Sequence, residues 1–460
     1  MAKCKRYLDF EPTENPAWRS RLVGNACKKI PTVSEMISEI LTYRKKYLKA
    51  LSSKKVCREE KDKADKELLI KFLLNVQEEE KIGMRNAGKT QEVINYIDAL
   101  TLEENERGVK RHPSTDSGSS QNSIDGEDNA KRRKANGLST KVEQFELPCY
   151  PSLGNTEDEI SCTYKSISQS SKPAKEEQET RNLYRGYKHI AKEVHQAQME
   201  VEDINNQAQM KEEDISSYLG LMDVDTCILQ THKILMDDIM DDHHTGPGKF
   251  STNERQANFN GVKHVYPQFA ADKSAFAAVT MIVDQYNDMI YEIGKILDGD
   301  RNKEEQLKLS FKCASLFLFG FLTLHPFGDG NGRLARLLCS YSLLTFSPFL
   351  TPIYNVFSST VEDDYVQALV AARENLTISQ MINTEDEAKQ VADIVLRQKP
   401  SDLCALIIES NWSMWRKYLD ILGIHKIEPY QWESGYCTEK LRLFPNIQSS
   451  LERQENVQKS

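Results

Sequence analysis

The sequence predicts an all-α fold with a small β-hairpin and a helical N-terminal extension. Apolar residues recur at spacings of three and four over much of the chain, which is typical of amphipathic helices. A nearly uniformly apolar run at 313–324 predicts a buried central helix. Alternation combined with turn residues at 249–267 predicts the hairpin.

The helical N-terminal extension is expected to cover residues 1–107. Its first helix is indicated by apolar residues that share one face: Met36, Ile37, Ile40, Leu41, Tyr43 and Leu48. A second apolar patch follows at 68–74, and a third, short helical pattern lies at 93–102. Because three heptads in good register are not present, both a helical hairpin and a coiled-coil arm stay open.

Residues 108–145 are predicted to be a disordered linker, because Ser, Gly and Asp dominate and apolar residues are almost absent. Basic clusters at 110–111 and 131–134 resemble a bipartite nuclear import signal. A solvated run of charge is the alternative interpretation.

Composition narrows the class of protein. A chain of 460 residues has room for two or three domains, and its net charge of −9 argues against direct nucleic-acid binding. The ten cysteines lack the paired spacing of metal sites and are expected to be reduced thiols. Residues 1–19 lack the apolar core of a signal peptide, so we expect a cytoplasmic and/or nuclear protein without a membrane partner.

Beyond the linker, further helices are expected in four segments: 176–197, 215–238, 276–297 and 304–323. Residues 354–371 are expected to continue the fold. His232 falls on the inward face of the second segment and is interpreted as a core histidine rather than a ligand. The uncharged run at 337–357 is long enough to span a bilayer, but its hydroxyl residues and prolines favour a buried helix and loop. A C-terminal helical segment and tail at 401–460 carries an aromatic cluster: Trp412, Trp415, Tyr418 and Trp432. We expect this cluster to be core, with a partner-binding patch as the alternative.

A short polar loop between two apolar runs carries the chemistry. Gly330 and Gly332 let the backbone approach a ligand closely. A helix that begins near Asn331 would point its free N–H groups back at the loop and create an anion site. Arg333 and Arg336 lie three residues apart on that helix, so both suit neighbouring phosphates.

Two further side chains of this loop complete the set of groups predicted to bind or act on a phosphate. Asp329 is a hard oxygen ligand suited to a Mg²⁺ ion that also contacts substrate phosphates. His325 is the one group of the loop that titrates near neutral pH, which makes it the natural general base. Each feature alone has an ordinary structural explanation, such as a tight turn or a solvated helix face. Their combination in one uninterrupted loop favours attack on an activated phosphate.

At this loop the chain resembles the Fic family. Residues 325–333 match the motif HPFx(D/E)GNGR at every specified position, and Arg336 matches the second arginine that commonly follows. The resemblance covers roughly residues 145–400 and implies a Fic-type helical bundle at 146–400. It also implies transfer of AMP from ATP, with Mg²⁺, to a Ser, Thr or Tyr hydroxyl of a target protein.

The resemblance implies a role for each motif residue. His325 would take the proton from the target hydroxyl, and Asp329 would hold Mg²⁺. Asn331 and the backbone at Gly330 and Gly332 would hold the α- and β-phosphates, while Arg333 and Arg336 would contact the β- and γ-phosphates. The expected catalytic residues are His325, Asn331 and Arg333. The expected nucleotide-binding residues are Phe327, Gly328, Asp329, Gly330, Asn331, Gly332, Arg333 and Arg336, with Phe327 anchoring the loop in the core.

The hairpin corresponds to the family's flap, which docks the target segment as an added strand. Its expected docking residues are Lys249, Phe250, Ser251 and His264. Ser251 departs from the family pattern Gly-x-Phe/Tyr-Arg, which places the flap contacts in question. His264 is interpreted either as facing the site or as an ordinary surface histidine.

Many family members carry an inhibitory helix, (S/T)xxxE(G/N), whose Glu pairs with the second motif arginine. By position, Leu153 stands where this Glu would be and Cys149 where the Ser or Thr would be. We therefore expect Arg336 to lack an internal carboxylate partner, which argues against autoinhibition and against removal of AMP.

Several alternatives stay open. The transferred group is UMP, phosphate or phosphocholine in one alternative, and the chain is a non-catalytic adaptor in another. The membrane anchor and tetratricopeptide repeats of the animal Fic enzymes are not recognisable here. The target protein is unknown, and both self-modification and a homodimer are left open.

Overall fold

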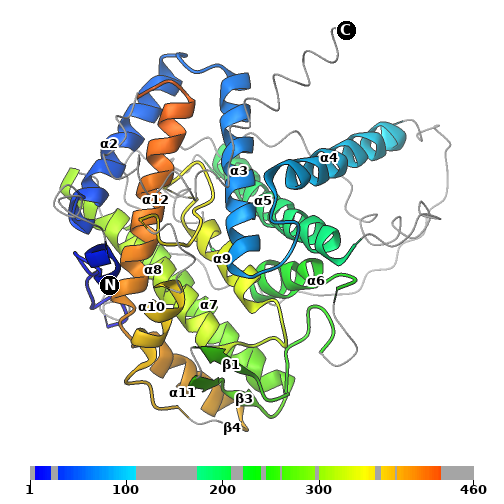
Figure 1. Ribbon diagram of the computed structural model, residues 1–460, viewed down its shortest axis with the longest axis vertical. Helices are drawn as coiled ribbons and strands as arrows, with labels where there is room; N and C mark the ends of the chain where they lie inside the picture. The colour runs from blue at the N-terminus through cyan, green and yellow to red at the C-terminus, as the bar shows by residue number, and fades with distance from the viewer. Residues whose placement is uncertain are drawn as a thin grey trace.

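Helices make up most of the computed structural model (Figure 1), which confirms the predicted all-α class. The structure describes residues 6–21, 30–109, 174–208, 221–239, 245–259, 262–295, 300–344, 346–357, 364–378 and 381–425. The N-terminal part comprises the 3-10 turn η1 (Ala17–Arg21), α2 (Val33–Ser52), α3 (Arg58–Glu79) and α4 (Ala87–Val109). The middle part comprises α5 (Lys175–Ala208), the π-helical turn η4 (Val224–Gln230) and α6 (Thr231–Leu235). The remaining helices are α7 (Asp272–Gly294), α8 (Asp300–Leu324), α9 (Asn331–Ser342), α10 (Asp364–Arg373), α11 (Glu385–Leu396) and α12 (Ser401–Ile421).

The central helix is α8, as the apolar run predicted. It packs against α7, α9, α11 and α12, so its side chains are covered on several sides. By length and composition, its segment Lys303–Leu324 could cross a membrane, but 89% of the apolar window is buried inside the protein. A helix that is apolar on nearly all sides is stable only when other helices cover it. α8 is therefore the core helix, and its C-terminal end leads into the polar loop.

The N-terminal helices join the same hydrophobic core. α2 lies against α12 and α8, and α3 contacts α4, α5 and α12. Trp412, Trp415 and Tyr418 of α12 are fully buried in this contact region, which confirms the core interpretation of the aromatic cluster for these three residues. Buried polar partners hold the packing: the Trp412 Nε1–H donates to Glu39 over 2.7 Å, and the Tyr418 hydroxyl donates to Asp65 over 2.7 Å.

The predicted hairpin is present. Strands β1 (Gln256–Phe259) and β2 (Val262–Val265) pair in antiparallel register, with Gln256 opposite Val265. A second pairing was not predicted: β3 (Gln268–Phe269) runs parallel to β4 (Met381–Ile382), near the start of α7 and α11 (Figure 1). Strands of two residues are too short to show any periodicity, so the sequence pattern carries no signal for them.

Several predictions fall outside the described residues. These are the linker with its basic clusters, the proposed inhibitory position Leu153, the aromatic residue Trp432 and the C-terminal tail beyond 425. The linker, the import signal and the domain boundaries stay predictions.

Candidate active site

The polar loop lies between the last residue of α8 and the first residue of α9, as the sequence predicted. Asn331 shapes it from within: its Oδ1 accepts from the backbone N–H of Phe327 over 3.0 Å, and its Nδ2 donates to the Phe327 carbonyl over 2.8 Å. Phe327 itself is fully buried and anchors the loop, as expected. Both polar atoms of the Asn331 amide thus hold the loop backbone, and its expected contact with phosphates stays a prediction.

The start of α9 provides an anion site. Gly330 is the residue before the helix and has a φ of 78°, a left-handed conformation that glycine adopts without strain. The first helical hydrogen bond runs from the Leu334 N–H to the Gly330 carbonyl over 3.0 Å. The N–H groups of Asn331, Gly332 and Arg333 precede that bond and have no intrahelical acceptor, so they are available to an anion.

The Arg333 guanidinium has one nitrogen that is hydrogen-bonded and one that has no partner among the described residues. Its Nη2 donates to Asp329 Oδ2 over 3.0 Å, while its Nη1 is buried and has no hydrogen-bond partner in the part of the chain described. The Arg333 side chain is 5% exposed and the Asp329 side chain 58% exposed. A buried donor without a partner costs free energy unless a ligand accepts from it. The buried Nη1–H of Arg333 can therefore donate to an anionic group that binds at the loop.

His325 lies at the end of α8 against the hairpin. Its imidazole stacks on the ring of Tyr266, with centroids 3.9 Å apart and an interplanar angle of 11°. The Arg373 guanidinium lies over the Tyr266 ring, 5.6 Å from its centroid, and donates to Thr323 at the end of α8. Tyr266 and Arg373 were not identified from the sequence, because they follow the hairpin and lie in α10, far from the motif.

The surroundings of His325 keep its imidazole neutral. Burial, together with the nearby charges of Arg255 and Arg373, lowers the pKa of His325 to about 3. A neutral imidazole has a lone pair that can accept a proton. His325 can therefore act as a general base from mildly acidic pH upward.

The start of the hairpin is attached to the loop. The Ser251 N–H donates to the Pro326 carbonyl over 2.9 Å, and Phe250 packs on Phe327 with ring centroids 5.0 Å apart. Ser251 itself carries no guanidinium, but Arg255, four residues later, is buried and its Nη1 donates to the Ser251 carbonyl over 2.5 Å.

Of the other expected flap residues, Lys249 is exposed at the start of the hairpin. His264 is half-buried and meets the Tyr266 ring edge-on, with centroids 4.9 Å apart. His264 thus contacts the ring on which His325 stacks, and both interpretations of His264 stay predictions.

Arg336 has an internal carboxylate partner, contrary to the expectation drawn from Leu153. Its Nε donates to Glu80 Oε1 over 2.9 Å, and its Nη2 lies 3.9 Å from Glu79 Oε2. Burial opposes the charge of Arg336, yet Tyr365, Glu80 and Glu79 together raise its pKa above the usual value. The Glu80 carboxylate also lies directly against Gly332, where any Cβ would overlap it. An anion thus already lies between the start of α9 and Arg336.

Glu80 is held in place by α5. It follows the last residue of α3, and the turn after it is bound by the first turns of α5. The Gly83 N–H donates to Glu179 over 2.8 Å, and the Met84 N–H donates to Thr180 over 3.0 Å. Gln77 of α3 donates to the same Thr180 hydroxyl over 3.1 Å. These bonds fix the position from which Glu80 reaches the loop.

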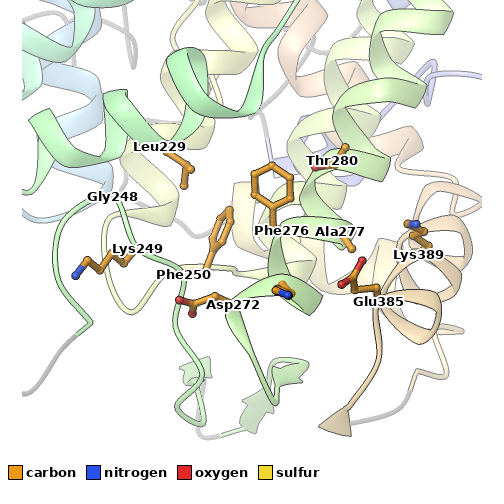
Figure 2. A pocket seen from close by; sticks show the side chains of 11 residues that line it. Leu229, Gly248, Lys249, Phe250, Asp272, Phe276, Ala277, Thr280, Glu385 and Lys389 are labelled. Atoms are coloured by element: carbon orange, nitrogen blue, oxygen red, sulfur yellow. The ribbon is translucent and has the colours of Figure 1, made fainter. Parts of the chain in front are cut away.

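A cavity of about 500 Å³ lies beside the start of the hairpin (Figure 2). Phe250 and Phe276 form its aromatic wall, with ring centroids 6.4 Å apart, while Lys249, Asp272 and Glu385 add charge at its edge. None of the loop residues lines it. It is therefore separate from the anion site, although Phe250 contacts both the cavity and the loop residue Phe327.

Comparison with known proteins agrees with this geometry. Residues 225–343 match the model of the Fic/DOC family. A Fido domain-containing protein of Dictyostelium discoideum is 37% identical over 117 residues, which are 25% of this chain and 64% of that protein. The chain thus carries a Fic domain.

Two other similarities are more limited. The ribonucleoside-diphosphate reductase small chain of Ostreid herpesvirus 1 is 28% identical over 122 residues, which are 26% of this chain and 19% of that protein. A Fic domain containing signaling protein from Bacteroides thetaiotaomicron superposes with a TM-score of 0.35 and 18% identity, over 57% of this chain and 79% of that one. The chain thus spans less than two thirds of the length of both curated relatives.

Proposed function

We propose that the protein transfers AMP from ATP to a Ser, Thr or Tyr hydroxyl of a target protein. The observation that carries this proposal is the Arg333 Nη1, which is buried near the start of α9 and has no hydrogen-bond partner among the residues that the structure describes. This guanidinium N–H, the first N–H groups of α9 and a neutral imidazole together suit the attack of a hydroxyl on a phosphate.

In the proposed reaction the target oxygen attacks the α-phosphorus of ATP. A bond forms from that oxygen to phosphorus, and the bond from phosphorus to the oxygen bridging to the β-phosphate breaks, so that pyrophosphate leaves. His325 accepts the hydroxyl proton. Arg333 and the first N–H groups of α9 hold the phosphate oxygens in line, where positioning and charge stabilisation supply most of the catalysis.

The residues present fit the Mg²⁺ that the resemblance implies. Asp329 is a largely exposed carboxylate that pairs with Arg333, which is expected to contact the phosphates. Within the described residues there is no group of three or more His, Cys, Asp or Glu side chains that could hold a metal ion. One carboxylate is enough where substrate phosphates and water complete the octahedron, and the ion would offset phosphate charge there.

Replacing Asp329 with alanine should weaken Mg²⁺-dependent ATP binding by about 10- to 100-fold, because the metal loses its protein ligand. Calorimetry with and without Mg²⁺ measures this directly. Since Asp329 also pairs with Arg333, Asp329→Asn is the matched variant that can still accept this hydrogen bond. An unchanged Mg²⁺ dependence in the alanine variant would remove Asp329 from the ligand set.

The pH dependence of kcat/KM should show no acid limb from His325 between pH 5 and 7. This quantity reports ionisations of the free protein, where burial and two arginines lower the pKa of His325 to about 3. The imidazole therefore becomes protonated, and kcat/KM falls, only when the pH approaches that value. In Arg373→Gln one of the two nearby positive charges is removed, so the pKa of His325 should rise and the acid limb of kcat/KM should move to higher pH. An acid limb near 6.5 in the native protein would contradict the neutral, buried base.

We infer further that Glu80 restrains the reaction. The resemblance assigns the γ-phosphate to Arg336, and the Glu80 carboxylate already binds this arginine. ATP has to displace that carboxylate before all three phosphates fit. The same carboxylate supports a second candidate activity, removal of AMP from a modified target, which Leu153 had argued against.

The test is incubation of the purified protein with α-labelled ATP and Mg²⁺, with Glu80→Gly run beside the native chain. Label on the protein itself or on a lysate protein supports AMP transfer, and its subsequent loss only with native Glu80 supports AMP removal. Label from γ-labelled ATP or α-labelled UTP would move the assignment to another transferred group. No label and no nucleotide binding in either chain would favour the adaptor.

A further inference from the structure

His232 of α6 is a buried core histidine, as the sequence indicated, and it lies under the loop. It is fully buried, and its ring stacks on Phe327 with centroids 3.7 Å apart and an interplanar angle of 8°. Its Nε2 is 3.0 Å from the carbonyl oxygen of Asp329. Its Nδ1 accepts from the backbone N–H of Gly248 over 2.9 Å. One side chain therefore joins the loop to the start of the hairpin.

These two contacts determine the tautomer. The Gly248 N–H can only donate, so Nδ1 carries the lone pair and the ring proton is on Nε2. The Nε2–H then donates to the Asp329 carbonyl. A protonated ring would place a hydrogen on Nδ1 against the Gly248 N–H. The neutral form is also the one that burial favours, since burial lowers the pKa of His232 to about 4.

The bonded carbonyl belongs to the most constrained part of the loop. Gly330 follows Asp329 immediately and adopts the left-handed conformation that starts α9. A Cβ at Gly330 would overlap Met236 and lie 3.4 Å from His232 Nε2, so α6 packs tightly against this turn. The peptide between Asp329 and Gly330 sets both the direction of the Asp329 side chain and the first N–H groups of α9.

We propose that His232 is a positioning residue that orients the Asp329–Gly330 peptide for phosphate and metal binding and links it to the hairpin that starts at Gly248. This inference rests on the proposed function. Gly248 lines the cavity beside the hairpin (Figure 2), so His232 connects a wall of that cavity to the anion site.

Three variants separate the contacts. Phenylalanine keeps a ring that can stack on Phe327 but loses both hydrogen bonds. Glutamine places an amide near the position of Nε2 and can still donate to Asp329, whereas asparagine places its amide near Nδ1 and reaches only the Gly248 side. The matched control is Asn287→Ala, since Asn287 also makes two hydrogen bonds to backbone, over 2.8 and 2.9 Å to Met222, away from the loop.

The experiment measures hydrogen exchange of the loop amides, Mg²⁺·ATP affinity and AMP transfer, all in the full chain. In His232→Phe we expect loop exchange at least about 10-fold faster, a raised half-saturating Mg²⁺ concentration and a kcat lower by about 100-fold, the loss that a small displacement at a reacting centre produces. His232→Gln should recover more of each quantity than His232→Asn. Asn287→Ala should lower thermal stability while leaving loop exchange and the Mg²⁺ requirement unchanged.

Equal behaviour of the glutamine and asparagine variants, or loop exchange and Mg²⁺·ATP affinity unchanged in His232→Phe, would overturn the proposal. If His232→Phe does not fold, the comparison of His232→Gln with His232→Asn tests the proposal instead. Failure of the proposed function would look different: the native protein would transfer no AMP, while loop exchange would still report whether His232 orders the loop.

Discussion

Replacing Glu80 with glycine should raise AMP transfer by about 10- to 100-fold. In the native protein the carboxylate forms a charge-assisted hydrogen bond with the buried Arg336 and lies against Gly332 at the start of α9. Such bonds contribute about 1.5–3 kcal/mol, and ATP has to replace this one when its γ-phosphate binds. Removal of the carboxylate frees both the guanidinium and the helix N-terminus for phosphate.

The rate with α-labelled ATP and the affinity for Mg²⁺·ATP measure the effect. Glu78→Gly is the matched control, because it weakens the same helix end but leaves the carboxylate on Arg336. Glu79→Gln tests the more distant carboxylate, at 3.9 Å, and should have a smaller effect. A Glu80→Gly protein with unchanged rate and affinity would show that Glu80 does not compete with the nucleotide.

Replacing His325 with alanine should lower AMP transfer by about 100- to 10,000-fold, the usual contribution of a positioned general base. The imidazole is held by stacking on Tyr266, and its low pKa leaves it ready to accept the target's proton. Because the phosphates are expected to contact Arg333, Arg336 and the start of α9, ATP affinity should change little.

This variant is best measured in the Glu80→Gly background, where the starting rate is expected to be highest. The control is Tyr266→Phe, which keeps the aromatic ring against the imidazole and should retain most of the activity. Parallel loss of transfer and ATP binding in His325→Ala would mean that the histidine maintains the loop structure instead of acting as the base.

The local features of this protein followed from its sequence. The apolar run that forms α8 and the hairpin at β1–β2 each have their own periodicity, and the contiguous motif placed His325, Asp329 and Arg333 in one loop. Within one loop or helix, neighbours in the chain are necessarily neighbours in space, so the pattern is enough. The resemblance to the Fic family also placed Phe327 in the core, where it is fully buried.

What only the tertiary structure decided are the contacts between distant segments. Glu80 reaches Arg336 across 256 positions of sequence, from a helix end whose run of acidic residues looks like any solvated surface. The inhibitory motif of the family places its carboxylate at the position of Leu153, and no other pattern in the sequence indicates a carboxylate partner for Arg336. Arg255 in place of Ser251, Tyr266 and Arg373 beside His325, and His232 beneath Asp329 likewise depend on packing across helices. Periodicity within one element specifies which face is buried, but the identity of the residue that meets that face is set by the whole fold.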